Sequence, residues 1–340
     1  MECTVDSPLP STSRITLHTL RTPRIGERQR FSLAVRSALV NDDENAASLN
    51  ELLSQTWTIF GVSALFEFNQ DEVCLKMYAK RMREYVATRL TKEDVMYDAT
   101  FKVRENLGPR PSPQDHLPIQ IEVVAKTIGR EENIKKCIYK GILLSWKTTS
   151  NEKNNGNSVR LPLLLCRGTR SCMEAVHSML SHMFDCMVLA LPAKEEDLMW
   201  LLPIVLASTN AEDDPKANDM VALEYIIPGL PVTDTITVKF KVLDLTKMLS
   251  VITGDESDST NVETVLDLEH IEKFYEVLNT QMLDFACLRL GLCTLRRINL
   301  PALTIMENRM KVNDIDALNH VLLYLNKKAV GVLHSLNFNV

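Results

Sequence analysis

The stretch from Val159 to Ser208 constrains the fold of this chain most strongly. An apolar run ending at Cys166 is followed by a helical pattern from Ser171 to Phe184, a second apolar run from Asp185 to Leu191, and a Trp-bearing helical pattern. Short apolar runs that alternate with amphipathic helices are typical of strands that pack beneath helices. The stretch therefore predicts the interior of a domain built from both helices and strands.

The sequence on either side extends this pattern. The run from Thr235 to Val242 alternates apolar residues with Thr and Lys, which predicts an antiparallel sheet with one buried and one wet face. We therefore predict an α+β fold with curved, mostly antiparallel sheets flanked by helices. Further helices are predicted at residues 46–55, 71–90, 244–252, 263–281 and 314–336. Further strands are predicted at residues 57–68, 97–103, 119–126, 137–146, 221–227, 284–293, 295–300 and 303–306.

The first 44 residues differ in composition from the rest of the chain. Residues 1–36 carry six arginines and three acidic residues, a net charge of +3, so the remainder of this −6 chain carries −9. We predict a disordered basic tail over residues 1–44, an α+β half over 45–210 and a second α+β half over 211–340, the halves forming one continuous structural unit. So acidic a body repels phosphate over most of its surface, which favours protein partners.

Motifs for phosphate or metal chemistry do not fit this sequence. Phosphate-binding loops need clustered glycines, and the eleven glycines here lie at least twelve residues apart. Cys172, His177, His182 and Cys186 have an attractive spacing for a metal site. On a helix, however, the two histidines point about 140° apart and do not converge on one ion. We therefore predict neither a metal nor a cofactor.

A nucleophile is equally unsupported. Cys186 opens an apolar run, where a buried thiol is protonated and inert, so core packing is the favoured interpretation. Carboxylate pairs such as Glu195-Glu196 lack the apolar surroundings that raise a pKa. We therefore predict a protein that is not an enzyme. The eight cysteines form no CxxC pair and suit a reducing compartment, and the apolar run Leu198–Ala207 is too short to cross a bilayer.

Two short segments are candidates for interactions. Leu288, Leu290 and Leu292 alternate in the predicted strand at residues 284–293, which has no covering sequence after it and would suit β-augmentation by a partner. Arg296 and Arg297 concentrate positive charge and are candidates for contact with a DNA backbone. No aromatic residues are interleaved with basic ones in a run that would stack bases, so sequence reading is not expected.

Several core segments taken together resemble the centromere protein L family, whose members are subunits of the constitutive inner kinetochore. The order and spacing of these segments match over about residues 46–336. They are Leu53-x-x-x-Trp57-Thr58-x-Phe60-x-x-x-x-Leu65-Phe66-x-Phe68, Leu161-Pro162-Leu163-x-Leu165, Phe184-Asp185-Cys186, Leu198-x-Trp200, Glu224-Tyr225, and the apolar helix that closes the chain.

The resemblance implies a non-catalytic scaffold located in the nucleus, at the centromere and kinetochore of the chromosome. It implies a heterodimer with centromere protein N through the C-terminal parts of both proteins. It also implies links to centromere protein C, to the subcomplex of centromere proteins H, I, K and M, and to centromeric nucleosome or linker DNA, mostly through the complex. The implied fold is similar to a bacterial recombination-associated ring protein and to the fungal counterpart of protein L.

Two alternatives remain open from the residues alone. An independent DNA-binding protein of the ring-forming type predicts basic residues that converge on one concave surface and binding that depends steeply on salt. A cryptic enzyme predicts titratable groups with perturbed pKa values that converge in a cleft.

Overall fold

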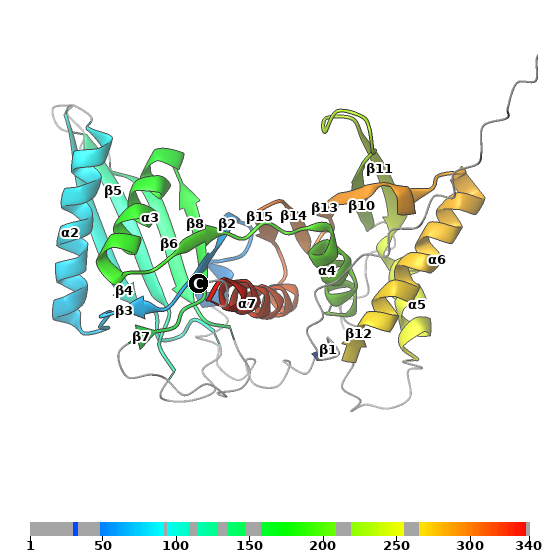
Figure 1. Ribbon diagram of the computed structural model, residues 1–340, viewed down its shortest axis with the longest axis horizontal. Coiled ribbons are helices and arrows are strands. Elements are labelled where there is room, and N and C mark those ends of the chain that lie inside the picture. The colour runs from blue at the N-terminus through cyan, green and yellow to red at the C-terminus, as the bar shows by residue number, and fades with distance from the viewer. Residues whose placement is uncertain are drawn as a thin grey trace, which may run out of the picture.

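One open antiparallel sheet runs through the molecule (Figure 1). The computed structural model describes residues 30–32, 48–91, 94–108, 115–127, 135–146, 158–208, 219–254 and 265–337. Eleven strands form the main sheet in the order β11-β10-β13-β14-β15-β2-β8-β6-β5-β4, and β9 also pairs with β2. Helices flank the sheet, so the predicted α+β class with antiparallel sheets is confirmed.

The strands of the main sheet come from all parts of the described chain. Their bounds are β2 (Thr56–Val62), β4 (Val95–Val103), β5 (Ile119–Thr127), β6 (Lys135–Leu144), β8 (Leu163–Gly168), β9 (Val188–Ala190), β10 (Met220–Ile226), β11 (Thr235–Lys241), β13 (Thr294–Asn299), β14 (Leu303–Met306) and β15 (Arg309–Val312). Two small sheets pair β1 (Arg30–Ser32) with β12 (Val265–Asp267), and β3 (Leu65–Phe66) with β7 (Ser158–Val159).

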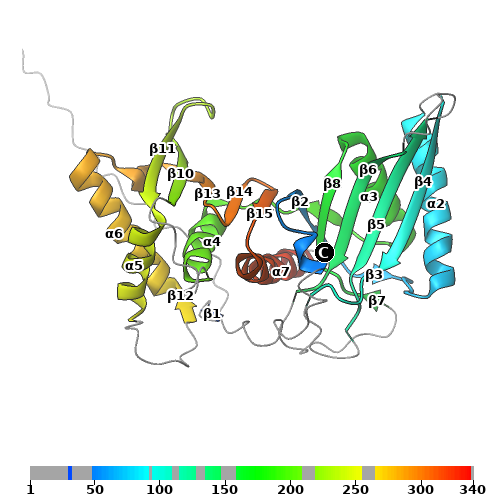
Figure 2. The same ribbon diagram turned by 180° about the vertical axis from the view of Figure 1, so that it is seen from behind.

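The amino-terminal lobe consists of β4, β5, β6 and β8 with helices α2 (Glu72–Leu90) and α3 (Arg170–Phe184). Both helices cover the same face of the sheet, as Figure 2 shows from the opposite side. Met82, Tyr139 and Phe184 lie at the centre of this core. Because side chains alternate across a strand, every second residue of these strands points to the face away from α2 and α3.

The carboxy-terminal lobe consists of β10, β11, β13, β14 and β15 with four helices on one side. These helices are α4 (Glu195–Ser208), α5 (Val242–Thr253), α6 (Leu268–Ala286) and α7 (Ile315–Asn337). In both views α4, α5 and α7 lie below the strands of this lobe, and α6 rises along its outer side (Figures 1 and 2). The apolar residues of β10, β13 and β15 point into this second core.

The two cores lie on opposite faces of one sheet. Leu143 and Leu164 belong to the amino-terminal core, whereas their neighbours Leu144 and Leu165 belong to the carboxy-terminal core. Since successive side chains of a strand point to opposite faces, β6 and β8 contribute to both. β15 pairs with β2 and α7 packs on β2, so the lobes share a continuous ladder.

A buried ion pair fixes α4 to α7 within the carboxy-terminal lobe. The Nζ atom of Lys328 lies 2.7 Å from Oδ2 of Asp197, and the Tyr324 hydroxyl donates to Oδ1 at 3.1 Å. Thus α4, which precedes residue 210, packs with helices that follow it. The division into halves at residues 210 and 211 stays a prediction.

The secondary structure differs from the predictions at several places, among them β12, which lies inside the helix predicted at residues 263–281. Arg30–Ser32 lies in the predicted disordered tail, yet it forms β1 and buries Phe31 in the carboxy-terminal core. The rest of residues 1–44 lies outside the described residues. The predicted strand at residues 284–293 is wrong, because α6 continues to Ala286 and Leu290–Leu292 forms a 3-10 turn. The helix ends at Cys287, whose positive φ of 54° turns the chain.

Candidate functional site

The three leucines predicted to bind a partner lie in the turn after α6 and do not share one exposed face. Leu290 is 1% exposed and sits in the core, and Leu288 is half-buried against the same core. Leu292 is 66% exposed. A strand would have placed all three on one face, but the 3-10 turn separates them. Of the three, Leu292 is the side chain exposed for a partner.

Leu292 lies in the turn that follows α6, close in sequence to two further exposed apolar side chains at the end of this helix. Phe285 is 89% exposed on the last turn of the helix, and Leu283 is also exposed. We call Leu283, Phe285 and Leu292 the α6-end patch. Leu283 and Phe285 point to different sides of α6, because residues two apart on a helix are separated by about 200°. Several exposed apolar side chains within one short segment still favour an interaction site more than a single exposed leucine does.

Among the described residues, β11 is the edge strand of the sheet in this lobe. This strand pairs with β10 over seven residues and ends the strand order on that side. A groove of about 350 Å³ lies at one end of this strand, between residues 239–241 of β11, Met220 of β10, residues of α5, and Gln281 of α6. Gln281 lies one turn before Phe285, so the groove and the α6-end patch share the same end of α6.

Arg296 and Arg297 lie inside the sheet, on β13, and both contact acidic residues. Nη2 of Arg296 lies 3.6 Å from Glu307, and its Nη1 donates to the Val232 carbonyl at 2.9 Å. Arg297 lies 3.8 Å from Glu224. The register between β10 and β13 shifts between Glu224 and Tyr225. This bulge gives β13 one extra residue, so that Arg296 and Arg297 both lie between the core residues Leu295 and Ile298. Their charge is therefore partly neutralised within the protein.

The face of β10, β11, β13 and β15 away from the helices carries further positive charge. Arg297 of β13 and Arg309 of β15 both pair with Met306 of β14, which lies between them, so the three residues form one row across this face. Lys239 and Lys311 belong to the next row. We call Lys239, Lys241, Arg297, Arg309 and Lys311 the basic sheet face. Residues two strands apart are separated by about 10 Å, so the cations form a spaced array. The alternation Arg309-Met310-Lys311-Val312 was the sequence signal for β15 and its cations, and the sequence predictions missed it.

On the face of the amino-terminal lobe away from α2 and α3, several charged side chains form ion pairs with one another. Lys126 lies 3.1 Å from Asp98, and Arg104 lies 2.7 Å from Glu51. The buried Lys140 also contacts Glu51. Partial burial opposes ionisation of Glu51, yet Lys140 and Arg104 hold the pKa of its carboxyl below its usual range. These ion pairs partly neutralise Lys126, Arg104 and Lys140 within the protein.

The histidines and cysteines weighed as catalytic or metal-binding groups lie in or on the amino-terminal lobe. His177 packs edge-on against Phe60, and burial lowers its pKa to about 4, while His182 is exposed on another side of α3. Burial raises the pKa of the Cys186 thiol to about 11. Within the part of the chain that the structure describes, no cluster of His, Cys, Asp or Glu could hold a metal ion. A neutral imidazole and a protonated thiol in an apolar core favour packing over nucleophilic chemistry.

No helix among the described residues is long and apolar enough to span a bilayer.

Comparison with known proteins identifies the family. A family model described as Centromere protein L matches residues 51–330, which is more than half of the chain. The match includes both lobes, the basic sheet face and the α6-end patch. None of the curated proteins matches the chain. The chain therefore belongs to the centromere protein L family.

Proposed function

We propose that this protein is a non-catalytic structural subunit of the inner kinetochore that pairs with centromere protein N. In this role it links centromeric chromatin to centromere protein C and to the subcomplex of centromere proteins H, I, K and M, and so supports kinetochore assembly and chromosome segregation. Membership of the centromere protein L family makes the chain a kinetochore subunit, with a nuclear, centromeric location. Its pairing and linking roles are the proposal.

The observation that carries the pairing proposal is that the α6-end patch and the edge strand β11 belong to the same lobe, with Gln281 of α6 lining the groove next to β11. An unpaired edge offers backbone hydrogen bonds to a strand of the partner. The exposed Phe285 and Leu292 offer apolar area that a partner would remove from water. Together they supply the two components of a strand-addition interface, which are backbone pairing for affinity and side-chain contacts for specificity.

The test is co-expression with centromere protein N, using Phe285→Asp and Leu292→Asp. Removal of an apolar anchor from the centre of an interface is expected to weaken association by about tenfold or more. Val251→Asp is the matched control, because Val251 is 82% exposed on α5 of the same lobe. If the patch variants co-purify with centromere protein N as well as Val251→Asp does, and all three remain folded, the proposed interface is wrong.

A second candidate function is DNA binding by the isolated chain, and the basic sheet face favours it. Five cations gather there around the carboxylate of Glu224, although the body of the chain is acidic. The same face would contact the DNA backbone within the complex if the scaffold proposal holds. Binding of duplex DNA by the isolated chain and by the complex, over a range of salt concentrations, separates the two cases.

A further inference from the structure

The other end of the main sheet is the strand β4, and its edge is long and regular. β4 pairs with β5 over nine consecutive residue pairs, from Val95 opposite Thr127 to Val103 opposite Ile119, without a shift in register. No other strand of the described residues pairs with β4. Natural proteins usually interrupt such an edge with a bulge or a proline, because unpaired backbone groups recruit other strands. β4 contains neither.

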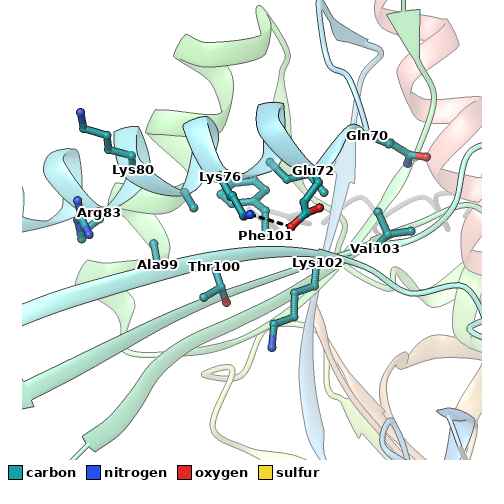
Figure 3. Close-up of a pocket in the computed structure, with 12 residues that line it drawn as sticks. Gln70, Glu72, Lys76, Lys80, Arg83, Ala99, Thr100, Phe101, Lys102 and Val103 are labelled. Carbon is teal, nitrogen blue, oxygen red and sulfur yellow. Dashed lines mark ion pairs between the residues drawn. The ribbon is translucent and has the colours of Figure 1, made fainter.

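A groove of about 690 Å³ follows this edge between α2 and β4 (Figure 3). Five consecutive residues of β4, from Ala99 to Val103, line it. Phe101 points toward the helix, whereas Thr100 and Lys102 point away from it. Because both sets of side chains border the groove, it passes along the backbone edge between the two faces of the sheet.

The walls of the groove combine apolar and positively charged groups. Leu75, Ala79 and Phe101 supply apolar surface beneath α2. Lys76, Lys80, Arg83 and Lys102 supply positive charge. Among the lining residues Glu72 is the one carboxylate, and it lies 2.7 Å from Lys76. The exposed Lys80, Arg83 and Lys102 therefore carry most of the available charge.

We propose that β4 accepts an extended, acidic peptide segment of a partner protein as an added strand in this groove. The backbone of the peptide pairs with the free edge of β4. Its side chains on the helix side contact Phe101, Ala79 and the stems of the lysines, and its carboxylates meet Lys80 and Arg83. Charge complementarity selects an acidic segment, because the groove carries four cations and one paired carboxylate. This site lies at the opposite end of the sheet from the surface proposed for centromere protein N.

The test uses the full chain and two synthetic peptides of about ten residues, long enough to cover β4. One peptide alternates Glu with Val and the other alternates Lys with Val, and binding is followed by fluorescence anisotropy. The acidic peptide is expected to bind more tightly than the basic one, with an affinity that falls as salt is added. Equal binding of the two peptides overturns the proposal.

Variants on α2 test where the peptide binds. Arg83→Glu is expected to weaken binding by about tenfold, whereas Arg81→Glu changes it by less than about twofold. Arg81 is the matched control, because it is also exposed on α2 but does not line the groove. Glu72→Gln is expected to strengthen binding, since it releases Lys76 from its ion pair. Equal effects of Arg81→Glu and Arg83→Glu would show nonspecific attraction and contradict the site.

Backbone pairing is tested separately. Two versions of the acidic peptide carry N-methyl groups on alternate residues, in opposite registers. In an added strand, every second N–H group of the peptide points toward β4. The version with methyl groups on these N–H groups is expected to lose binding, and the version with methyl groups on the others is expected to keep it. Amide hydrogen exchange should slow in β4 when the unmodified peptide binds. Loss of binding by both versions with unchanged exchange in β4 would indicate a helical occupant and overturn strand addition. A concentration-dependent dimer that the peptide does not dissociate would assign the edge to a second copy of the chain and also overturn it.

Discussion

The two ends of the main sheet present the same backbone chemistry in different surroundings. Among the described residues, β11 and β4 each pair on one side only, and a groove borders each of them. The lobe that contains β11 also carries the exposed apolar side chains Phe285 and Leu292 at the end of α6. Beside β4 lie Lys80, Arg83 and Lys102.

Under the two proposals above, this difference would let one sheet bind two kinds of partner. Apolar anchors next to an edge favour a stable partner that buries them, because the free energy gained grows with the apolar area removed from water. Cations next to an edge favour an acidic segment whose binding is rapid and sensitive to salt. We therefore assign the β11 end to the constitutive partner and the β4 end to a separate acidic segment.

The largest expected effect separates the buried leucine of the turn after α6 from the exposed one. Leu290→Asp places a charge in the core and is expected to destabilise the protein by about 4 kcal/mol or more. Leu292→Asp changes an exposed side chain and is expected to cost less than about 0.5 kcal/mol. Urea denaturation of both variants measures the difference. Similar stabilities would mean that the 3-10 turn does not bury Leu290.

The second prediction asks whether the two ends of the sheet belong to one cooperative unit. Asp197→Ala removes the carboxylate that pairs with Lys328 and accepts from the Tyr324 hydroxyl, leaving Lys328 with the Pro192 carbonyl, and is expected to cost about 3 kcal/mol. If the lobes unfold together, amide exchange at β4 should accelerate along with exchange at β11, although β4 is remote from the mutation. Glu196→Ala, an exposed change on the same helix, is the control. Faster exchange confined to β11 would show that the lobes unfold separately.

The third prediction concerns the loss of stability of the amino-terminal lobe at acidic pH. His177 has a pKa of about 4 in the folded protein against 6.5 in the unfolded chain, because burial disfavours its charged form. The unfolded chain therefore binds more protons between these values, and stability falls as the pH drops from about 6.5 towards 4. The loss is at most about 3 kcal/mol. It should be absent in His177→Leu, and equal pH dependence of the two proteins would exclude this histidine as the cause.

The smallest expected effect distinguishes DNA binding at the basic sheet face from DNA binding at the groove between α2 and β4. Lys239→Glu combined with Lys311→Glu should reduce the salt dependence of duplex DNA binding by about one unit of slope for each lysine. Arg83→Glu should leave that slope unchanged, because Arg83 lies at the other end of the sheet. A reduced slope for Arg83→Glu alone would show that DNA binds along the β4 edge instead.

The sequence predicted much of the fold correctly. The helices at α2, α3, α4 and α7 and the hairpin of β5 with β6 lie close to their predicted positions, because periodicity and flanking turn residues define them locally. The strand order could not be predicted from the sequence, because the pairing of β15 with β2 joins residues more than 240 positions apart. The alternation of Leu288, Leu290 and Leu292 resembled a strand, but capping of α6 at Cys287 directed the chain into a turn.

The candidate interfaces were less predictable than the core. Phe285 lies in the segment predicted as a strand, and only the structure of α6 reveals that its side chain faces solvent on a helix. Arg296 and Arg297 were predicted from their proximity in sequence, but their ion pairs with Glu307 and Glu224 depend on tertiary contacts. Likewise, the edges of a sheet become known only when its strand order is known.

The central claim is that the β11 end of the sheet pairs with centromere protein N. Hydrogen exchange of the full chain, alone and in the co-expressed complex, tests it most directly. We expect slower exchange in β11 and in residues 283–292 of the complex, with β4 unchanged. Unchanged exchange at β11 and around Phe285, or slower exchange at β4 alone, would contradict the assignment of this end to the constitutive partner.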